Sequence, residues 1–219
     1  MSSRQGQRDQ LRHWLPSQGV DPAPLAELNS ECLGLLALRA GGEGDPCGLP
    51  PLITELHELW ADLPAQAVRR LAAAPFSLFD ADFGGSGRGL ELRATGVHDL
   101  PEPSVPVFFD SSAGRSITRR MLVYGWHLAR SRPRAACLVF GATLPAVETL
   151  AACSLAALDT VAERKGDGLR PRWPHQIYFW RELLLAASAG TDGRLHELLL
   201  GGVQRLAAES LAAQSFVSS

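Results

Sequence analysis

The residues best suited to chemistry in this sequence are arginines that lie between residues 111 and 147, a stretch without any Asp or Glu. They are Arg115, Arg119, Arg120, Arg130, Arg132 and Arg134. Cations without acidic neighbours are expected where a protein contacts nucleic-acid phosphates. They are also expected where it docks on an acidic protein surface, including the N-terminal half of its own chain. A third interpretation, solvated helix faces with internal salt bridges, also remains open.

The charge of the whole chain is divided unequally between its two halves. Residues 1–110 contain 8 Arg against 15 Asp and Glu, whereas residues 111–219 contain 12 Arg and 1 Lys against 8 acids. The net charge is only −2. An acidic half beside a basic half indicates either self-complementary packing or one surface for an anionic partner. Lys165 is the only lysine, and this preference for arginine is typical of GC-rich codon usage.

The cysteines and histidines do not form a recognisable metal site. No two of the four cysteines are two to four residues apart, so the close ligand spacing of structural zinc sites is missing. We therefore expect reduced thiols in apolar surroundings, and neither a metal nor a cofactor. The cysteines are Cys32, Cys47, Cys137 and Cys153.

Familiar catalytic motifs are incomplete. The glycine cluster at residues 84–89 lacks the lysine and the following helix of a phosphate-binding loop, which favours a flexible turn. His57-Glu58 lacks the second histidine that a zinc protease needs at position 61. We therefore predict no enzymatic activity, unless the fold assembles a site from distant residues. The candidates for such a site are Asp80, Asp82, His98 and Asp99.

The elements that must position these residues are mostly helices. Apolar residues at spacings of three and four predict helices near residues 21–40, 51–63 (restarting at Pro64 toward Leu71), 119–129, 134–141, 145–152, 155–164, 177–189 and 195–211. Shorter apolar or alternating runs at 76–80, 90–93 and 105–109 favour strands. The predicted fold is mainly α, a multi-helix bundle with a small β or irregular insertion around residues 76–113. This insertion separates helical regions at 1–75 and 114–219, and all three form one compact unit.

The composition and the first residues bear on the location of the chain. Apolar residues make up 46% of the sequence, which is enough for a substantial core. The first eight residues are polar and basic, with no apolar run behind them to act as a signal peptide. The longest apolar windows are shorter than the roughly 20 residues that a membrane span needs. We therefore expect a cytoplasmic protein that does not enter a membrane.

Part of the basic half resembles a known family. Residues 134–143 (RAACLVFGAT), 150–158 (LAACSLAAL) and 162–163 (AE) resemble the FlhD subunit of the bacterial flagellar master activator. The resemblance covers residues 119–172 and departs from the family at Ala142, where isoleucine is usual, and at Ala157, where glutamine is usual. It implies a helical co-regulator that acts with a zinc-bearing partner subunit, the heteromer recognising DNA.

Three functional hypotheses follow from these observations. The first is a non-enzymatic interaction protein, a FlhD-like transcriptional co-regulator whose arginines meet DNA phosphates or an acidic partner. In it, the apolar ends of the last two helices serve assembly, including assembly into a homo-oligomer. The second is a cytosolic adaptor of a bacterial secretion or motility machine that binds no nucleic acid. The third is an enzyme with a site that only the fold assembles.

Overall fold

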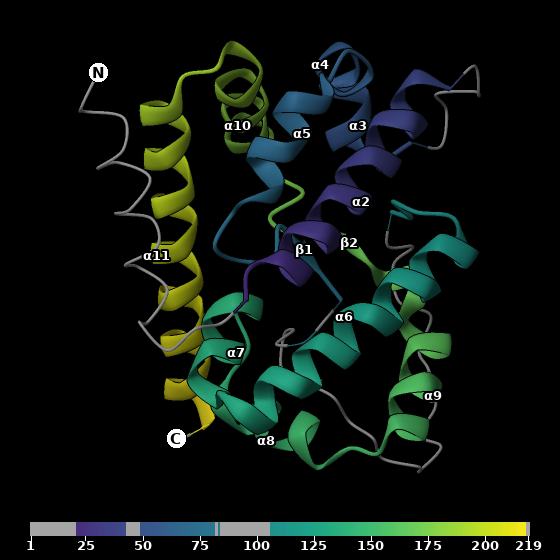
Figure 1. Cartoon of the computed structure of the whole chain (residues 1–219), viewed down its shortest axis with the longest axis vertical. Coiled ribbons are helices and arrows are strands. Elements are labelled where there is room, and N and C mark those ends of the chain that lie inside the picture. Colours follow the sequence, from purple (N-terminus) through teal and green to yellow (C-terminus); the bar gives the residue numbers. More distant parts are fainter. Residues whose placement is uncertain (1–20, 43–48, 82, 84–105, 218–219) are drawn as a thin grey trace.

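The protein is mainly helical, which confirms the predicted fold class. A computed structural model describes residues 21–42, 49–81, 83 and 106–217, with side chains up to residue 212. About ten helices pack together, and one small antiparallel sheet of two strands lies among them (Figure 1).

Most of the helices follow one another with short connections, but residues 73–110 separate the fourth from the fifth. They are α2 (Ala23–Gly41), α3 (Pro51–Glu55), α4 (His57–Ala61), α5 (Ala65–Ala72), α6 (Ser111–Ser131), α7 (Pro133–Phe140), α8 (Leu144–Ala152), α9 (Leu155–Lys165), α10 (Ile177–Ala189) and α11 (Asp192–Val217). A 3-10 turn, η1 (Gly166–Gly168), follows α9. Strand β1 (Phe79–Asp80) pairs with β2 (Arg170–Pro171), which joins segments about ninety residues apart.

Local sequence signals explain where the central helices begin and end. The Asp110 carboxylate accepts hydrogen bonds from the backbone N–H groups of Ser112 and Ala113, at 3.0 and 2.8 Å, and so caps α6. Ser154 caps α9 with one hydrogen bond, in which its hydroxyl oxygen accepts from the Ala157 N–H at 3.2 Å. Gly141 ends α7 at a φ of 60°, a left-handed conformation that glycine adopts readily.

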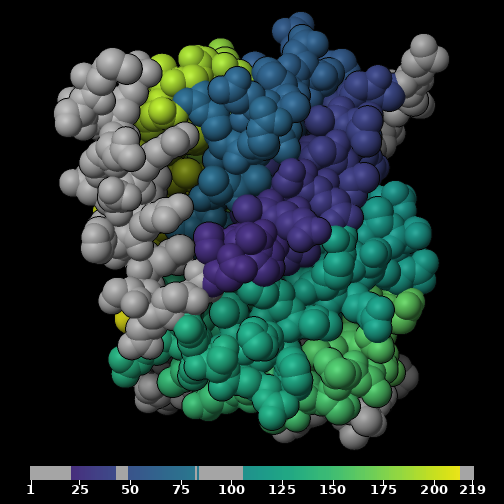
Figure 2. All heavy atoms as spheres, viewed as in Figure 1, coloured from purple at the N-terminus to yellow at the C-terminus, as the bar shows by residue number. Residues whose placement is uncertain are grey.

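The buried core joins the two halves of the chain. Trp60 of α4 and Trp180 of α10 lie with ring centroids 5.6 Å apart, and both are fully buried. Phe79 of β1 lies 6.2 Å from the Trp180 ring. Each indole N–H donates to a backbone carbonyl, so these large side chains are buried without losing a hydrogen bond. Figure 2 shows α2 and α6 side by side on one face, with α9 beyond α6.

The segment around residues 76–113 differs from its prediction. The predicted strand at 105–109 is wrong over residues 106–109, which form no strand; Phe108 and Phe109 are buried instead, and Phe109 packs edge-on against Phe79. The strand predicted at 76–80 is confined to 79–80, since the N–H groups of Ser77 and Leu78 donate to α7 and to Asn29. Strand β2 has no counterpart in the prediction. The predicted strand at 90–93 and the glycine-rich turn lie outside the described residues.

The helix predicted at 51–63 is two shorter helices, α3 and α4. The backbone at Leu56 departs from helical geometry, with φ −113° and ψ 24°. In the described part of the chain, no single helix is long and apolar enough to cross a membrane. Helices α7 and α8 reach that length and composition only as a pair, and they meet at a bend of 114°.

Candidate binding face on helix α6

The structure brings all six predicted arginines onto α6 and the first turn of α7, where they form two groups. The first group, near the start of α6, is paired with carboxylates from two neighbouring helices. The second group, where α6 ends and α7 begins, has no carboxylate partner among the described residues. The first group is Arg115, Arg119 and Arg120, and the second is Arg130, Arg132 and Arg134.

Arginines of the first group hold α6 against α9 and α2. The Nε and Nη2 atoms of Arg119 donate to the two carboxylate oxygens of Asp159 on α9, at 2.6 and 3.4 Å. This hydrogen bond and the carboxylate charge raise the pKa of the Arg119 guanidinium above its ordinary value. Arg120 pairs with Glu31 of α2, and Arg115 pairs with Glu163 of α9 at 3.3 Å. Internal pairing therefore uses part of the predicted basic surface.

Arginines of the second group keep their charges available. The Arg130 guanidinium lies over the Trp126 ring, with its central carbon 4.7 Å from the ring centroid. Arg134 is exposed, one residue after Pro133 begins α7. Arg132, in the turn between the helices, is half-buried, and its Nη1 is buried without a hydrogen-bond partner. Arg130 and Arg134 are thus the exposed cations most able to meet an anion from outside.

A shallow groove of about 580 Å³ lies between α6 and the start of α9. Val123 and Leu155 are unusually exposed for apolar side chains, at 38% and 55%, and both line it. We call this the α6–α9 groove. Its lining residues are Arg119, Arg120, Val123, Tyr124, Trp126, His127, Leu155 and Asp159.

The aromatic walls of the α6–α9 groove are fixed in place. The Trp126 indole N–H donates to the Cys153 carbonyl at 2.9 Å, and the Tyr124 ring packs edge-on against Phe140 at 5.9 Å. The Tyr124 hydroxyl donates to the Asp21 carbonyl at 3.4 Å. Side chains held in this way lose little freedom when a ligand binds, so the groove is preorganised.

The sequence predicted the arginines of this face but not the apolar side chains of its groove. Val123, His127 and Arg130 follow one another at spacings of four and three, a stripe on one helix that the sequence shows, whereas Arg134 lies on the next helix. The contribution of Leu155 was not visible, because only the packing of α9 on α6 places it beside Val123.

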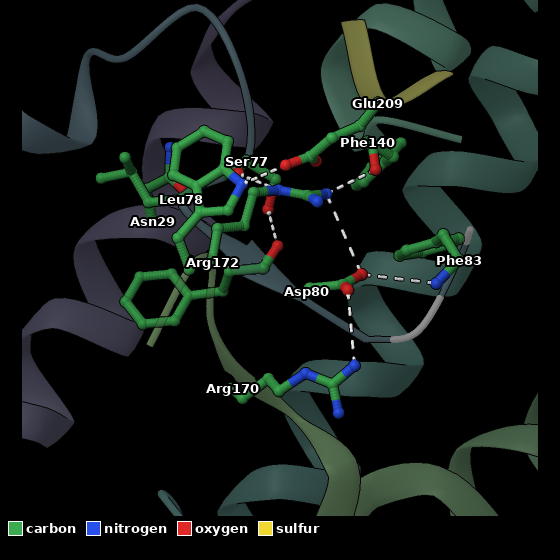
Figure 3. Close-up of polar contacts among 11 residues, drawn as sticks. Asn29, Ser77, Leu78, Asp80, Phe83, Phe140, Arg170, Arg172 and Glu209 are labelled. Carbon is green, nitrogen blue, oxygen red and sulfur yellow. Dashed lines mark hydrogen bonds and ion pairs between the residues drawn. The ribbon is translucent and has the colours of Figure 1, made fainter. Parts of the chain in front are cut away.

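A second group of polar side chains lies in the interior, around the sheet (Figure 3). Arg172 is buried; its Nε donates to the Ser77 carbonyl at 2.7 Å, and its Nη2 donates to the Phe140 carbonyl. Asp80 lies 3.9 Å from both Arg170 and Arg172. Burial lowers the pKa of the Arg172 guanidinium, and the Asp80 charge opposes that shift. We call Arg172, Asp80, Arg170 and the carbonyls of Ser77 and Phe140 the interior node.

Asn29 of α2 extends the interior node. Its side-chain amide donates to the Phe76 carbonyl at 3.1 Å and to the Ala72 carbonyl at 3.4 Å, and its oxygen accepts from the Leu78 N–H at 2.9 Å. These bonds satisfy backbone groups that strand pairing leaves free, in a segment with only two strand residues. Asn29 and Arg172 therefore stabilise the fold.

A second groove, of about 1010 Å³, lies between α3–α4 and the start of α10. Tyr178 projects from it with 82% of its surface exposed, and Arg181 lies on its rim. Acidic and basic side chains are mixed here, since Glu55 and Glu58 also line the groove. It therefore lacks the single sign of charge that distinguishes the end of α6.

Of the four side chains proposed for an active site, only Asp80 lies among the described residues. Asp80 belongs to the interior node, with two arginines beside its carboxylate. Asp82, His98 and Asp99 lie outside the described residues. The described residues contain no group of three or more His, Cys, Asp or Glu side chains that could hold a metal ion.

No protein-family model, curated protein or solved structure matches the chain. The resemblance of residues 119–172 to the FlhD family therefore stays a prediction.

Proposed function

We propose that this chain is a non-enzymatic adaptor that binds a partner protein through the α6–α9 groove and the arginines beyond it. One observation carries the proposal: exposed apolar side chains line a groove together with arginines, a histidine and Asp159. An apolar centre with a polar rim is the usual anatomy of a protein interface. The groove is also preorganised by the contacts of Trp126 and Tyr124.

The experiment is site-specific photo-cross-linking in cells that naturally express the protein. A photoreactive amino acid replaces Leu155 in the groove, and a matched variant carries it at Ser188, an exposed position on α10. We expect adducts to one protein at position 155 and none at 188. Arg130→Glu combined with Arg134→Glu should abolish the adducts while the helical circular dichroism stays unchanged. Equal adducts at both positions, or none at 155, would contradict the proposal.

A second candidate is the FlhD-like co-regulator. It is favoured by the resemblance of residues 119–172 and by the second group of arginines, which have no carboxylate partner among the described residues. In that case the cross-linked protein is a zinc-bearing regulator, and the pair binds duplex DNA with an affinity that falls steeply as salt rises. A secretion or motility component at position 155 would instead assign the chain to the adaptor class.

A further inference from the structure

We infer that the ligand of the α6–α9 groove is an acidic amphipathic helix that inserts one apolar side chain between Val123 and Leu155. Its carboxylates would meet His127 and Arg130, which follow Val123 on α6, and Arg134 at the start of α7. This inference rests on the proposed function and adds the chemistry of the partner segment. It is drawn from the charge, the apolar lining and the spacing of this face.

The charge of the face favours carboxylates over a nucleic-acid backbone. Arg119 and Arg120 already hold carboxylates from within the chain, at Asp159 and Glu31. The exposed arginines that remain are Arg130 at the end of α6 and Arg134 at the start of α7, and His127 lies one turn before Arg130. Duplex-binding proteins commonly neutralise about six to ten phosphates, which is more than these side chains supply. Two or three carboxylates on one helix face match them in number.

The apolar lining favours a protein side chain as the inserted group. Val123 and Leu155 are exposed at the groove, and the fixed edge of Trp126 forms part of the wall. A phosphodiester backbone offers nothing to bury against these groups. A leucine, methionine or phenylalanine would remove them from water while leaving its polar neighbours at the rim.

The spacing along α6 indicates that the ligand is a helix. His127 lies four residues after Val123, and Arg130 lies seven residues after it. At 1.5 Å per residue these steps are about 6 Å and about 10 Å along the axis. A second helix packed along α6 repeats the same steps, with its apolar anchor opposite Val123 and acids four and seven residues away.

The test uses a defined peptide. The probe is a fluorescein-labelled, alanine-based helix of 17 residues with Leu at its centre and Glu four and seven positions away on both sides, so that either orientation fits. The control peptide has the same composition with its Glu residues moved to the opposite face. We expect saturable binding of the probe by fluorescence anisotropy, at least tenfold tighter than binding of the control.

Matched protein variants locate the bound peptide. Arg130→Glu with Arg134→Glu should weaken binding at least tenfold, and Leu155→Ala should weaken it several-fold. Arg181→Glu with Arg69→Glu makes the same charge change at exposed positions on α10 and α5, and should leave binding unchanged. All substituted side chains are exposed, so loss of binding with unchanged circular dichroism reports the face and not the fold.

Three results would overturn the inference: no saturable binding of the probe, equal binding of both peptides, or tighter binding of a 16-base-pair duplex than of the probe. If the probe fails but cross-linking at position 155 persists, the adaptor proposal stands and only the helical acidic ligand is wrong. If both fail, the face is not a protein-binding site.

Discussion

Arginine serves two different purposes in the interior node and on the α6 face. Arg172 is buried, and backbone carbonyls and Asp80 surround its guanidinium. Arg130 at the end of α6 and Arg134 at the start of α7 are exposed, and neither has a carboxylate partner among the described residues. A buried charge contributes to stability only while every partner is present, whereas an exposed one contributes little to folding and stays available for a ligand.

The largest effect is expected at the interior node. Arg172→Ala would leave the Ser77 and Phe140 carbonyls without their donor and Asp80 without its closest buried cation. We expect the free energy of unfolding to fall by about 3–5 kcal/mol, measured by urea denaturation followed through tryptophan fluorescence. Arg181→Ala is the exposed control, expected within about 0.5 kcal/mol of wild type. A loss below about 1 kcal/mol for Arg172→Ala would contradict the role of the node.

Asn29→Ala is expected to have the next largest effect. It removes two donors and one acceptor from buried backbone groups near residues 72–78. Leaving such groups unsatisfied costs about 1–3 kcal/mol, and the same denaturation measurement reports it. The neighbouring Ser30→Ala is the matched control, because Ser30 is only partly buried. Equal stability of the two variants would show that Asn29 is dispensable.

Cys32 makes the free energy of unfolding depend on pH. Burial raises the pKa of its thiol, and the nearby Glu31 charge adds to the shift. The unfolded chain therefore loses the thiol proton above about pH 8.5, while the folded chain keeps it, so stability falls as pH rises beyond that value. Cys32→Ala should lessen the loss of stability between pH 8 and pH 10. An unchanged slope would contradict the assignment.

The smallest effect on stability is expected on the α6 face. Arg130→Glu with Arg134→Glu removes one contact over the Trp126 ring and no carboxylate pair among the described residues. We expect less than about 1 kcal/mol of change in the free energy of unfolding, together with loss of binding at the groove. A strong destabilisation would show that these arginines belong to the fold.

The sequence predicted the helices well because their signals are local. The spacing of apolar residues, Ser154 as a cap and the glycine at 141 each act within a few residues of the element they define. It predicted the position of the α6 arginines for the same reason. The partners of those arginines could not be predicted, since Glu31 and Asp159 reach them only through tertiary packing.

The interior node was not predicted either, and its components explain why. Ser77 and Phe140 contribute backbone carbonyls, which carry no sequence signal. Arg172 lies between Pro171 and Trp173, where nothing in the sequence distinguishes it from an exposed arginine. Strand β2 is two residues long, too short for a pattern of alternation.

The pairing of β1 with β2 has a consequence for synthesis of the chain. The first half leaves the ribosome with Trp60 and Phe79 uncovered, since Trp180 and the second strand follow about a hundred residues later. Contacts between such distant segments close slowly. Nascent chains that stop before α10 therefore expose aromatic surface, which makes them prone to aggregate until α10 is added.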